Sequence, residues 1–468
     1  MLRRPDDDPA QTIPGRDRLS RFIPKRLIRN NFVHNVMALY GVQACTYALP
    51  LLTFPYLARV LGPSGWGVVV FAQAIGVVIQ TLVEYGFDIS AMRETSRHRE
   101  DPKRLSGLIS GVLGAKSLLA VVGIAGAVLS RRFTHHIAPS PALFWASVIW
   151  GVCQGINMLW FFQGLERMQL ASTLEIGGKV LATASIFLLV HHPDDGWKVM
   201  AAQCVGCVVS HGVTVILAYR EVGFQWPTFS SVWESLRLGG SMFVFRTVQG
   251  LFGSVNRLVL GYFAPVAALG EYAGAERITR VFQQGMWPVN QALYPKLTQQ
   301  TQKDPARAIR IVRLSVVFLG ALGIVLGLAI YFGAPLLVHF VLGSAFKDSV
   351  PILRVFALWI PLVAISTVII FQILLPNQLD NQFNIVNLTT ALIGIAAAFA
   401  LAPEWKAVGI AWATVISQLY TVVAFCYIVW RAGLNPFSAR SARKPVLVAA
   451  LAGAGKPNHG SEDMDRAV

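Results

Sequence analysis

The stretch LASTLEIGGKVLATASIFLLV, residues 170–190, indicates the fold class of the chain. It is long and apolar enough to cross the hydrocarbon core of a bilayer, which needs about 20 mostly apolar residues in a helix. It nevertheless carries Glu175 and Lys179, which lie four positions apart and therefore share one helix face. We expect these two charges to pair, and to do so beside a hydrated path, because charges inside a membrane are costly.

The rest of the chain has a similar composition. Of its 468 residues, 54% are hydrophobic and 14% are charged, whereas a soluble domain has about 25% charged residues. The sequence therefore predicts an all-α polytopic membrane protein with about 12 transmembrane helices. The predicted spans are 33–58, 66–88, 105–129, 143–163, 170–190, 197–219, 236–262, 272–294, 309–332, 351–376, 382–402 and 406–430.

The distribution of Lys and Arg predicts the orientation of these spans. The first 32 residues are polar and basic, with no apolar core of a cleavable signal peptide. Lys and Arg are concentrated in this tail, in the C-terminal tail and in alternate loops such as RETSRHREDPKR (93–104). By the positive-inside rule, both termini are expected in the cytoplasm. The net charge of +16 is then explained by topology and by contact with anionic membrane lipids, and no nucleic acid is expected as a partner.

A short motif that occurs twice weakly suggests two related halves of six helices each. Val-Leu-Gly at 60–62 and at 259–261 is followed in each case by a short turn, a glycine and a new span. We therefore expect two bundles of six helices. The expected division is a cytoplasmic basic tail at 1–32, an N-terminal bundle at 33–228, a C-terminal bundle at 229–430 and a cytoplasmic tail at 431–468.

Cations inside the predicted spans indicate a hydrated cavity and the kind of ligand that it binds. Arg246 and Arg257 are eleven residues apart, which puts them about 20° apart around one helix. Arg277 and Arg280 share a face of the next span, where Glu276 can pair with Arg280. Such stripes predict a hydrated wall that attracts an anion, in particular a phosphate, which arginine binds with two hydrogen bonds. The other cations within spans are Lys116, Lys179 and Arg354.

The five cysteines are expected to be structural. Cys204 and Cys207 form a CxxC pair, which elsewhere indicates a metal or redox site. Because no second pair accompanies it, we interpret both as small buried residues at a helix interface. No catalytic residue, metal site or cofactor is predicted, and the chain is not expected to be an enzyme.

Several segments of the chain resemble a known family. The stretches LYGVQACTYALPLLTFPYLARVLGPSGWGVVVFAQAI (39–75) and EYGFDISAMRETSRHREDP (84–102) are similar to the polysaccharide-transporter family of Wzx-type oligosaccharide flippases. That family belongs to the multidrug/oligosaccharidyl-lipid/polysaccharide exporter superfamily. Shorter similar segments are WFFQGLERM (160–168), GEYAGAERI (270–278) and ALYPKL (292–297). The resemblance runs from about residue 33 to residue 430 and leaves out both tails.

The resemblance implies a function and a location. It implies two six-helix bundles around a central cavity that opens alternately to each side of the membrane. It also implies a flippase that moves undecaprenyl-pyrophosphate-linked oligosaccharide across the bacterial cytoplasmic membrane by this alternating access. It also implies cavity cations that meet the pyrophosphate, for which the candidates are Arg246, Arg257, Arg280, Arg277, Lys116 and Lys179. Gln43, Tyr47, Gln154 and Asn157 are the candidates for binding sugar hydroxyls. Ion-coupled antiport of a proton or sodium ion would use Glu84, Asp88 or Glu175. Polysaccharide polymerase and export machinery are further expected partners.

Two other functions compete with this prediction. A multidrug or organic-cation exporter of the same superfamily should carry acidic residues in its cavity, whereas the surplus here is basic. A membrane glycosyltransferase or polymerase usually needs a sizeable outer loop or an acidic metal-binding motif, and the predicted outer loops are short. The basic stripes therefore favour the flippase.

Overall fold

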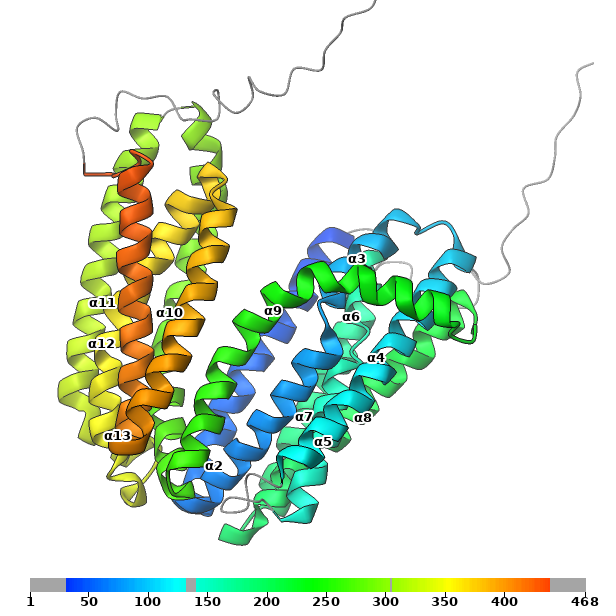
Figure 1. Cartoon of the computed structure of the whole chain (residues 1–468), viewed down its shortest axis with the longest axis horizontal. Helices are drawn as coiled ribbons and strands as arrows, with labels where there is room; N and C mark the ends of the chain where they lie inside the picture. Colours follow the sequence, from blue (N-terminus) through cyan, green and yellow to red (C-terminus); the bar gives the residue numbers. More distant parts are fainter. Residues whose placement is uncertain (1–30, 132–139, 304, 438–468) are drawn as a thin grey trace, which may run out of the picture. The chain divides into compact units, whose positions relative to one another are not determined.

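The computed structural model of the chain describes residues 31–131, 140–303 and 305–437. Within these ranges the ordered elements are helices, and no strand is present (Figure 1). The predicted tails, 1–32 and 431–468, lie almost entirely outside the described residues. The all-α prediction is confirmed.

Eight helical segments of the described residues are long and apolar enough to cross a membrane. Two of them, Ala48–Arg97 and Asp380–Arg431, have 50 and 52 residues. Since one span needs about 20 residues, each has the length of two predicted spans. The predicted spans 236–262 and 272–294 fall in two further helices outside these eight. The protein is therefore a multi-pass membrane protein, and the count of twelve spans stays a prediction.

The chain divides into two compact units. Unit 1 comprises the residues up to Leu61 together with 71–254, and unit 2 comprises 62–70 together with the residues from Val255 onward. The predicted division lay at 228/229, and a count of six helices in each bundle stays a prediction. The helices of unit 1 are α2 (Asn31–Glu84) without residues 62–70, α3 (Phe87–Arg97), α4 (Pro102–Ser130), α5 (Pro141–Gly155), α6 (Leu159–Gly164), α7 (Met168–Leu189), α8 (Gly196–Val222) and most of α9 (Phe229–Phe263).

Side-chain caps explain where two helices of unit 1 begin. Asp101 accepts hydrogen bonds from the backbone N–H groups of Lys103 and Arg104, at 3.2 and 3.1 Å. Ser140 accepts one from Leu143 N–H at 3.4 Å. In both cases a proline follows the cap, as suits the first helical position, where no N–H partner is needed. Short Asp-Pro and Ser-Pro pairs thus start α4 and α5.

The core of unit 1 surrounds the short helix α6. Phe161 and Phe162 are buried there with Phe87 of α3 and Ile109 and Val112 of α4. Full burial of such side chains stabilises a fold by about 1.5–3 kcal/mol each in water, although lipid-facing helices gain less. This core fixes the break between α5 and α6, where several predicted site residues lie.

Unit 2 contains the end of α9 and the helices α10 (Val266–Lys303), α11 (Pro305–Val341), α12 (Ser349–Val368) and α13 (Asp380–Arg431). A π-helical turn at Ile369–Leu374 continues α12. One core cluster of the unit joins Ile369, Ile373 and Leu374 of this turn to Phe425 of α13. Figure 1 shows α11, α12 and α13 running side by side, and α11 and α12 are packed against each other along their lengths.

The two Val-Leu-Gly motifs, at 60–62 and 259–261, are followed by segments that pack on each other within unit 2. A Cβ added at Gly67 would come within 2.0 Å of the Val266 carbonyl oxygen, and one added at Gly270 within 2.0 Å of the Pro63 carbonyl oxygen. The contact is reciprocal, since each glycine meets the carbonyl four residues before the other glycine. Only glycine allows this approach of the two backbones. The similar segments are thus related by their contacts as well as by their sequence.

Candidate functional site

The side chains of three predicted site residues lie outside the described part of the structure. Gln43 and Tyr47 belong to α2, and Arg246 belongs to α9. Their roles stay predictions. The other predicted residues fall into four separate groups, which lie around the break between α5 and α6, on α7, at the turn between α2 and α3, and where α9 meets α10.

Lys116 of α4 is buried, with 2% of its surface exposed. Its ammonium donates hydrogen bonds to the carbonyl oxygens of Gly155 at 2.8 Å and Asn157 at 3.1 Å. Gly155 is the last residue of α5 and Asn157 follows it closely, and the last C=O groups of a helix lack partners within the helix. A cation at a helix C-terminus is also favoured by the helix dipole. Lys116 therefore stabilises the helix break, and a contact with substrate stays a prediction.

Asn157 and Gln154 form part of the same break. The side-chain oxygen of Asn157 accepts a hydrogen bond from Leu159 N–H at 2.7 Å, next to the start of α6. The Gln154 carbonyl oxygen accepts one from Asn157 N–H at 3.3 Å. Asn157 thus satisfies backbone groups on both sides of the break, which is a common use of asparagine in turns. Binding of sugar hydroxyls by these two residues stays a prediction.

Glu175 and Lys179 of α7 form the predicted ion pair. The ammonium of Lys179 lies 2.7 Å from a carboxylate oxygen of Glu175, and the pairing is confirmed. Lys179 also donates to the hydroxyl of Thr46 on α2 at 2.7 Å. Both charged side chains are mostly covered, with 29% and 17% of their surfaces exposed for Lys179 and Glu175. The pair therefore links α7 to α2 as well as neutralising two charges.

The other two candidates for ion coupling lie at the turn between α2 and α3. Glu84 ends α2 and accepts a hydrogen bond from the side chain of Gln80 at 2.9 Å. Asp88 lies in the first turn of α3 and is half-buried. Between them, Tyr85 and Gly86 take positive φ angles of 46° and 77°, which turn the chain sharply. The two acids are thus close in sequence but belong to different helices.

The most highly charged group of predicted residues lies in unit 2. Glu276 of α10 is buried, and its two carboxylate oxygens each accept hydrogen bonds from one arginine. Nε and Nη2 of Arg257 on α9 donate to Oε2 at 3.1 and 3.0 Å. Nε and Nη2 of Arg280 donate to Oε1 at 3.0 and 2.6 Å. We call Arg257, Glu276 and Arg280 the arginine triad.

The arginine triad confirms one predicted pair and adds a partner that the sequence did not reveal. Arg280 and Glu276 were expected to pair because they are one helical turn apart. Arg257 is nineteen residues before Glu276 and lies on another helix, so no spacing rule predicts its contact. The predicted stripe of Arg257 with Arg246 stays a prediction, because the side chain of Arg246 is outside the described part of the structure. Arg277, the neighbour of Glu276, is half-buried beside the triad.

Two guanidinium groups share one carboxylate, so the arginine triad carries one net positive charge. Each guanidinium has five N–H donors in a plane, and the contacts with Glu276 use only Nε and Nη2. Arg280 keeps 45% of its side-chain surface exposed, whereas Arg257 keeps 21%. The geometry therefore combines a fixed orientation of both arginines with donors that remain for an anion such as a phosphate.

The fold and these charged groups define an all-helical, multi-pass membrane protein that keeps ion pairs and buried cations inside its helical units. Residues 32–301 match the family of polysaccharide biosynthesis proteins, and the chain belongs to this family. This confirms the family predicted from the segments at 39–75 and 84–102.

Two relatives and one solved structure extend the comparison. A "Putative O-antigen transporter" of Escherichia coli (strain K12) is 24% identical over 381 residues, covering 81% of this chain and 91% of the relative. A protein of the same description from Shigella dysenteriae is 22% identical over 392 residues, covering 83% and 96%. The lipid II flippase MurJ in an inward closed conformation has a TM-score of 0.63 at 13% identity, covering 85% of this chain and 87% of MurJ. The likeness to MurJ shows a shared fold.

Proposed function

We propose that this protein is a flippase that moves undecaprenyl-pyrophosphate-linked oligosaccharide from the cytoplasmic to the periplasmic leaflet, for surface or exopolysaccharide biosynthesis. The observation that carries the proposal is the arginine triad in a chain that matches two O-antigen transporter descriptions over most of its length. The fold shared with a lipid II flippase is consistent with a lipid-linked cargo.

The physical problem of such a flippase is the head group. The polyprenyl tail stays in lipid, so only the pyrophosphate and the sugars need a polar path. An unpaired anion is very costly in a medium of low dielectric constant, and nearby guanidinium groups lower that cost. In the proposed mechanism, Arg257 and Arg280 meet the pyrophosphate while Glu276 holds both in place, with Arg246 and Arg277 as further contacts. Gln43, Tyr47, Gln154 and Asn157 are the proposed contacts of the sugars.

The remaining parts of the proposal concern energy and placement. Movement against a gradient would be coupled to a proton or sodium ion through Glu84, Asp88 or Glu175. We place the protein in the bacterial inner membrane with both termini in the cytoplasm, because Lys and Arg are concentrated on that side. The basic loop 93–104 would then contact anionic lipids, and polymerase and export machinery would act on the product.

The first test is lipid extraction from cells that lack this protein, with mass spectrometry of polyprenyl-linked sugars and measurement of surface polysaccharide. Accumulated lipid-linked repeat units and lost polysaccharide, both reversed by the wild-type protein, are expected. The same cells should not be rescued by Arg280→Gln, but should be rescued by the matched control Arg354→Gln. The guanidinium carbon of Arg354 lies 5.6 Å from the centre of the Tyr331 ring, and Arg354 is not a member of the arginine triad.

The opposite result would point to another cargo. Unchanged lipids and polysaccharide, together with new sensitivity to cationic drugs, would overturn the flippase and favour a multidrug exporter. Rescue by Arg280→Gln at normal protein levels would remove the arginine triad from the substrate path while leaving the flippase in place. The two measurements therefore separate the function from its assigned residues.

A further inference from the structure

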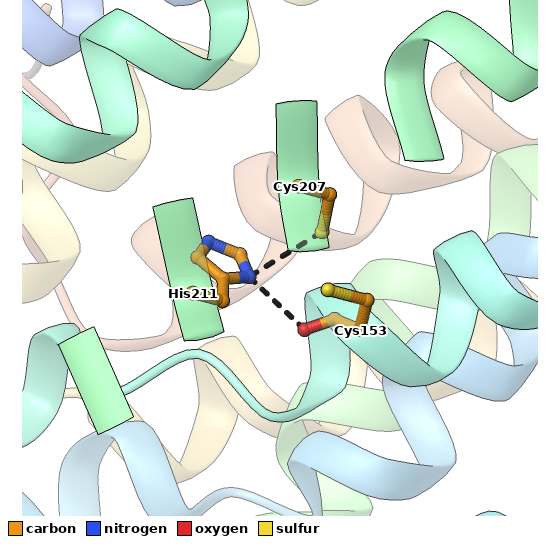
Figure 2. A group of neighbouring side chains, drawn as sticks. All are labelled: Cys153, Cys207 and His211. Carbon is orange, nitrogen blue, oxygen red and sulfur yellow. Dashed lines mark hydrogen bonds between the residues drawn. The ribbon is translucent and has the colours of Figure 1, made fainter. Parts of the chain in front are cut away.

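Three potential metal ligands, none of them among the predicted site residues, meet inside unit 1. Cys207 and His211 are one helical turn apart on α8, and Cys153 comes from α5 (Figure 2). Their ligand atoms all lie within 4.8 Å of one another. Figure 2 shows the imidazole of His211 facing both cysteines. Cys207 and His211 are buried, with 6% and 5% of their surfaces exposed, and Cys153 is half-buried.

Packing of α5 against α8 creates this cluster. The Nδ1 atom of His211 lies 3.0 Å from the carbonyl oxygen of Cys153 and 3.4 Å from the sulfur of Cys207. Cys153 lies about 18 Å along α5 from its first residue, and Cys207 about 16 Å along α8 from its first residue. Both distances place the cluster near the middle of the hydrocarbon layer, where polar groups are retained for a reason.

We propose that Cys153, Cys207 and His211 bind one thiophilic divalent metal ion of the Zn²⁺ class. The distances suit such an ion. Bonds of about 2.3 Å to sulfur and about 2.0–2.1 Å to nitrogen put two ligand atoms about 3.5–3.8 Å apart in a tetrahedron. The observed 3.4 Å between Cys207 Sγ and His211 Nδ1 is close to this value. Three protein ligands leave a fourth position for water, a known arrangement for zinc.

Charge favours a divalent ion over a monovalent one. Two thiolates and one Zn²⁺ have no net charge, whereas two thiolates and one Cu⁺ leave a net negative charge in an apolar layer. A neutral site avoids most of the desolvation cost of an isolated charge. Imidazole and thiolate are also the ligands that zinc prefers in proteins.

Binding requires a defined exchange of protons. The two thiols lose their protons to solvent as the sulfur–metal bonds form, so affinity rises with pH. The hydrogen bond from His211 Nδ1 to the Cys153 carbonyl is broken, and the imidazole takes the tautomer with hydrogen on Nε2. Its Nδ1 lone pair then binds the metal. No oxidation or reduction is involved.

The metal site would connect α8 to α5 close to the break between α5 and α6. Cys153 lies two residues before Gly155, whose carbonyl oxygen binds Lys116 at the break between α5 and α6. A metal that joins Cys153 to α8 would hold the end of α5 in place and stabilise unit 1. The proposal goes beyond the proposed function and does not depend on which substrate is moved. It also departs from the sequence-based expectation of no metal.

The test is a titration of the reduced, purified full-length protein in detergent with Co²⁺, which reports thiolate ligands by a charge-transfer absorption. One Co²⁺ per chain is expected, with displacement by Zn²⁺ and a rise in the thermal unfolding midpoint on adding Zn²⁺. Cys207→Ser, Cys153→Ser and His211→Gln should each weaken Co²⁺ binding by at least about tenfold, since even changes beyond the ligands cost that much.

Matched controls make the result decisive. Cys204→Ser changes the other half of the CxxC on the same helix, and Cys426→Ser changes a cysteine of α13; both variants should bind like the wild type. A well-folded wild-type protein that binds neither Co²⁺ nor Zn²⁺ would overturn the proposal. An equal loss in Cys204→Ser and Cys207→Ser would overturn the assigned ligands, and tight binding of Cu⁺ without Zn²⁺ would overturn the divalent assignment.

Discussion

Lys116 of unit 1 and the arginine triad of unit 2 stabilise buried positive charge in different ways. In unit 1, the ammonium of Lys116 binds the backbone carbonyls of Gly155 and Asn157. In unit 2, the guanidinium groups of Arg257 and Arg280 bind the single carboxylate of Glu276. The first cation has neutral partners and is fully buried, whereas the second pair shares a charged partner and one member stays half-exposed.

This difference indicates that Lys116 is a structural cation and that the arginine triad is a candidate binding site. A lysine ammonium has three donors and suits a cluster of carbonyl oxygens at a helix end. An arginine pair held by one carboxylate keeps donors in fixed directions, which suits recognition of a phosphate. We therefore expect changes at Lys116 to act mainly on stability, and changes at Arg280 to act mainly on transport.

Glu276→Gln should have the largest effect on stability. The change leaves the guanidinium groups of Arg257 and Arg280 close together without their carboxylate, and breaking a buried ion pair from one side costs about 3–5 kcal/mol. We expect the low end, because Arg280 is half-exposed. The measurement is the thermal unfolding midpoint in detergent, with Glu404→Gln, at an exposed acid of α13, as the control. Equal midpoints in the two variants would contradict a structural role of the triad.

Lys116→Met should have the next largest effect. It removes both hydrogen bonds to the carbonyls at the break and leaves these groups without that donor, at a cost of about 1–3 kcal/mol. Thermal unfolding and limited proteolysis in detergent would detect the loss, against the exposed control Lys347→Met. If Lys116→Met kept the wild-type midpoint but abolished transport, the lysine would belong to the substrate path and the contrast between the units would fail.

The ion pair of Glu175 and Lys179 on α7 can be tested by comparing a single variant with the double variant. Lys179→Ala leaves Glu175 as a partly buried acid without its cation, whereas Glu175→Ala with Lys179→Ala removes both charges. We expect the single variant to be less stable than the double variant by about 1 kcal/mol, because an unpaired charge costs more than a missing pair. The thermal unfolding midpoint and the transport activity should be measured for both variants. A stable double variant without transport would show that the pair also acts on the substrate.

The smallest effect is expected from an ion pair outside the spans. Arg99 donates to Glu166 at 2.7 Å, and this hydrogen bond and charge hold the pKa of Glu166 below its ordinary value of 4.5. A lowered folded-state pKa contributes stability above about pH 4.5, and the contribution is lost as pH falls through the folded-state pKa.

Glu166→Gln isolates that contribution. The wild type and the variant should differ slightly in unfolding midpoint at pH 6 and should converge near pH 3, because the exposed pair is weakened by water and salt. A difference that grew as the pH fell would contradict the assigned pair. Together with Glu276→Gln, this variant measures how much burial strengthens the same kind of ion pair.

Contacts within one helix were predictable from the chain. Glu175 with Lys179, and Glu276 with Arg280, are spaced by one helical turn, and both pairs are present. The membrane class followed from composition, because apolar stretches of this length have few other uses. The family followed from short segments such as the one at 39–75.

Contacts between helices were not predictable in this way. Arg257 reaches Glu276, and Lys116 reaches the carbonyls of a broken helix. No residue spacing encodes these meetings, since they depend on which helix faces pack together. The sulfur of Cys207 lies beside His211 of its own helix and Cys153 of α5, and the CxxC spacing to Cys204 does not reveal the contact with α5.

The amino-acid sequence by itself establishes a polytopic all-helical membrane protein and the ion pairs one helical turn apart, because hydropathy and helical periodicity are local properties. It also establishes the family, through short similar segments. Folding was needed to bring Arg257 to Glu276, Lys116 to the break after α5, and Cys153 to Cys207 and His211. Helices in a membrane are already hydrogen-bonded along their own backbones, so their neighbours are chosen by close packing and by a few polar contacts between faces. Those choices join residues that are distant in sequence, and they decide which buried charges are structural and which remain for a ligand.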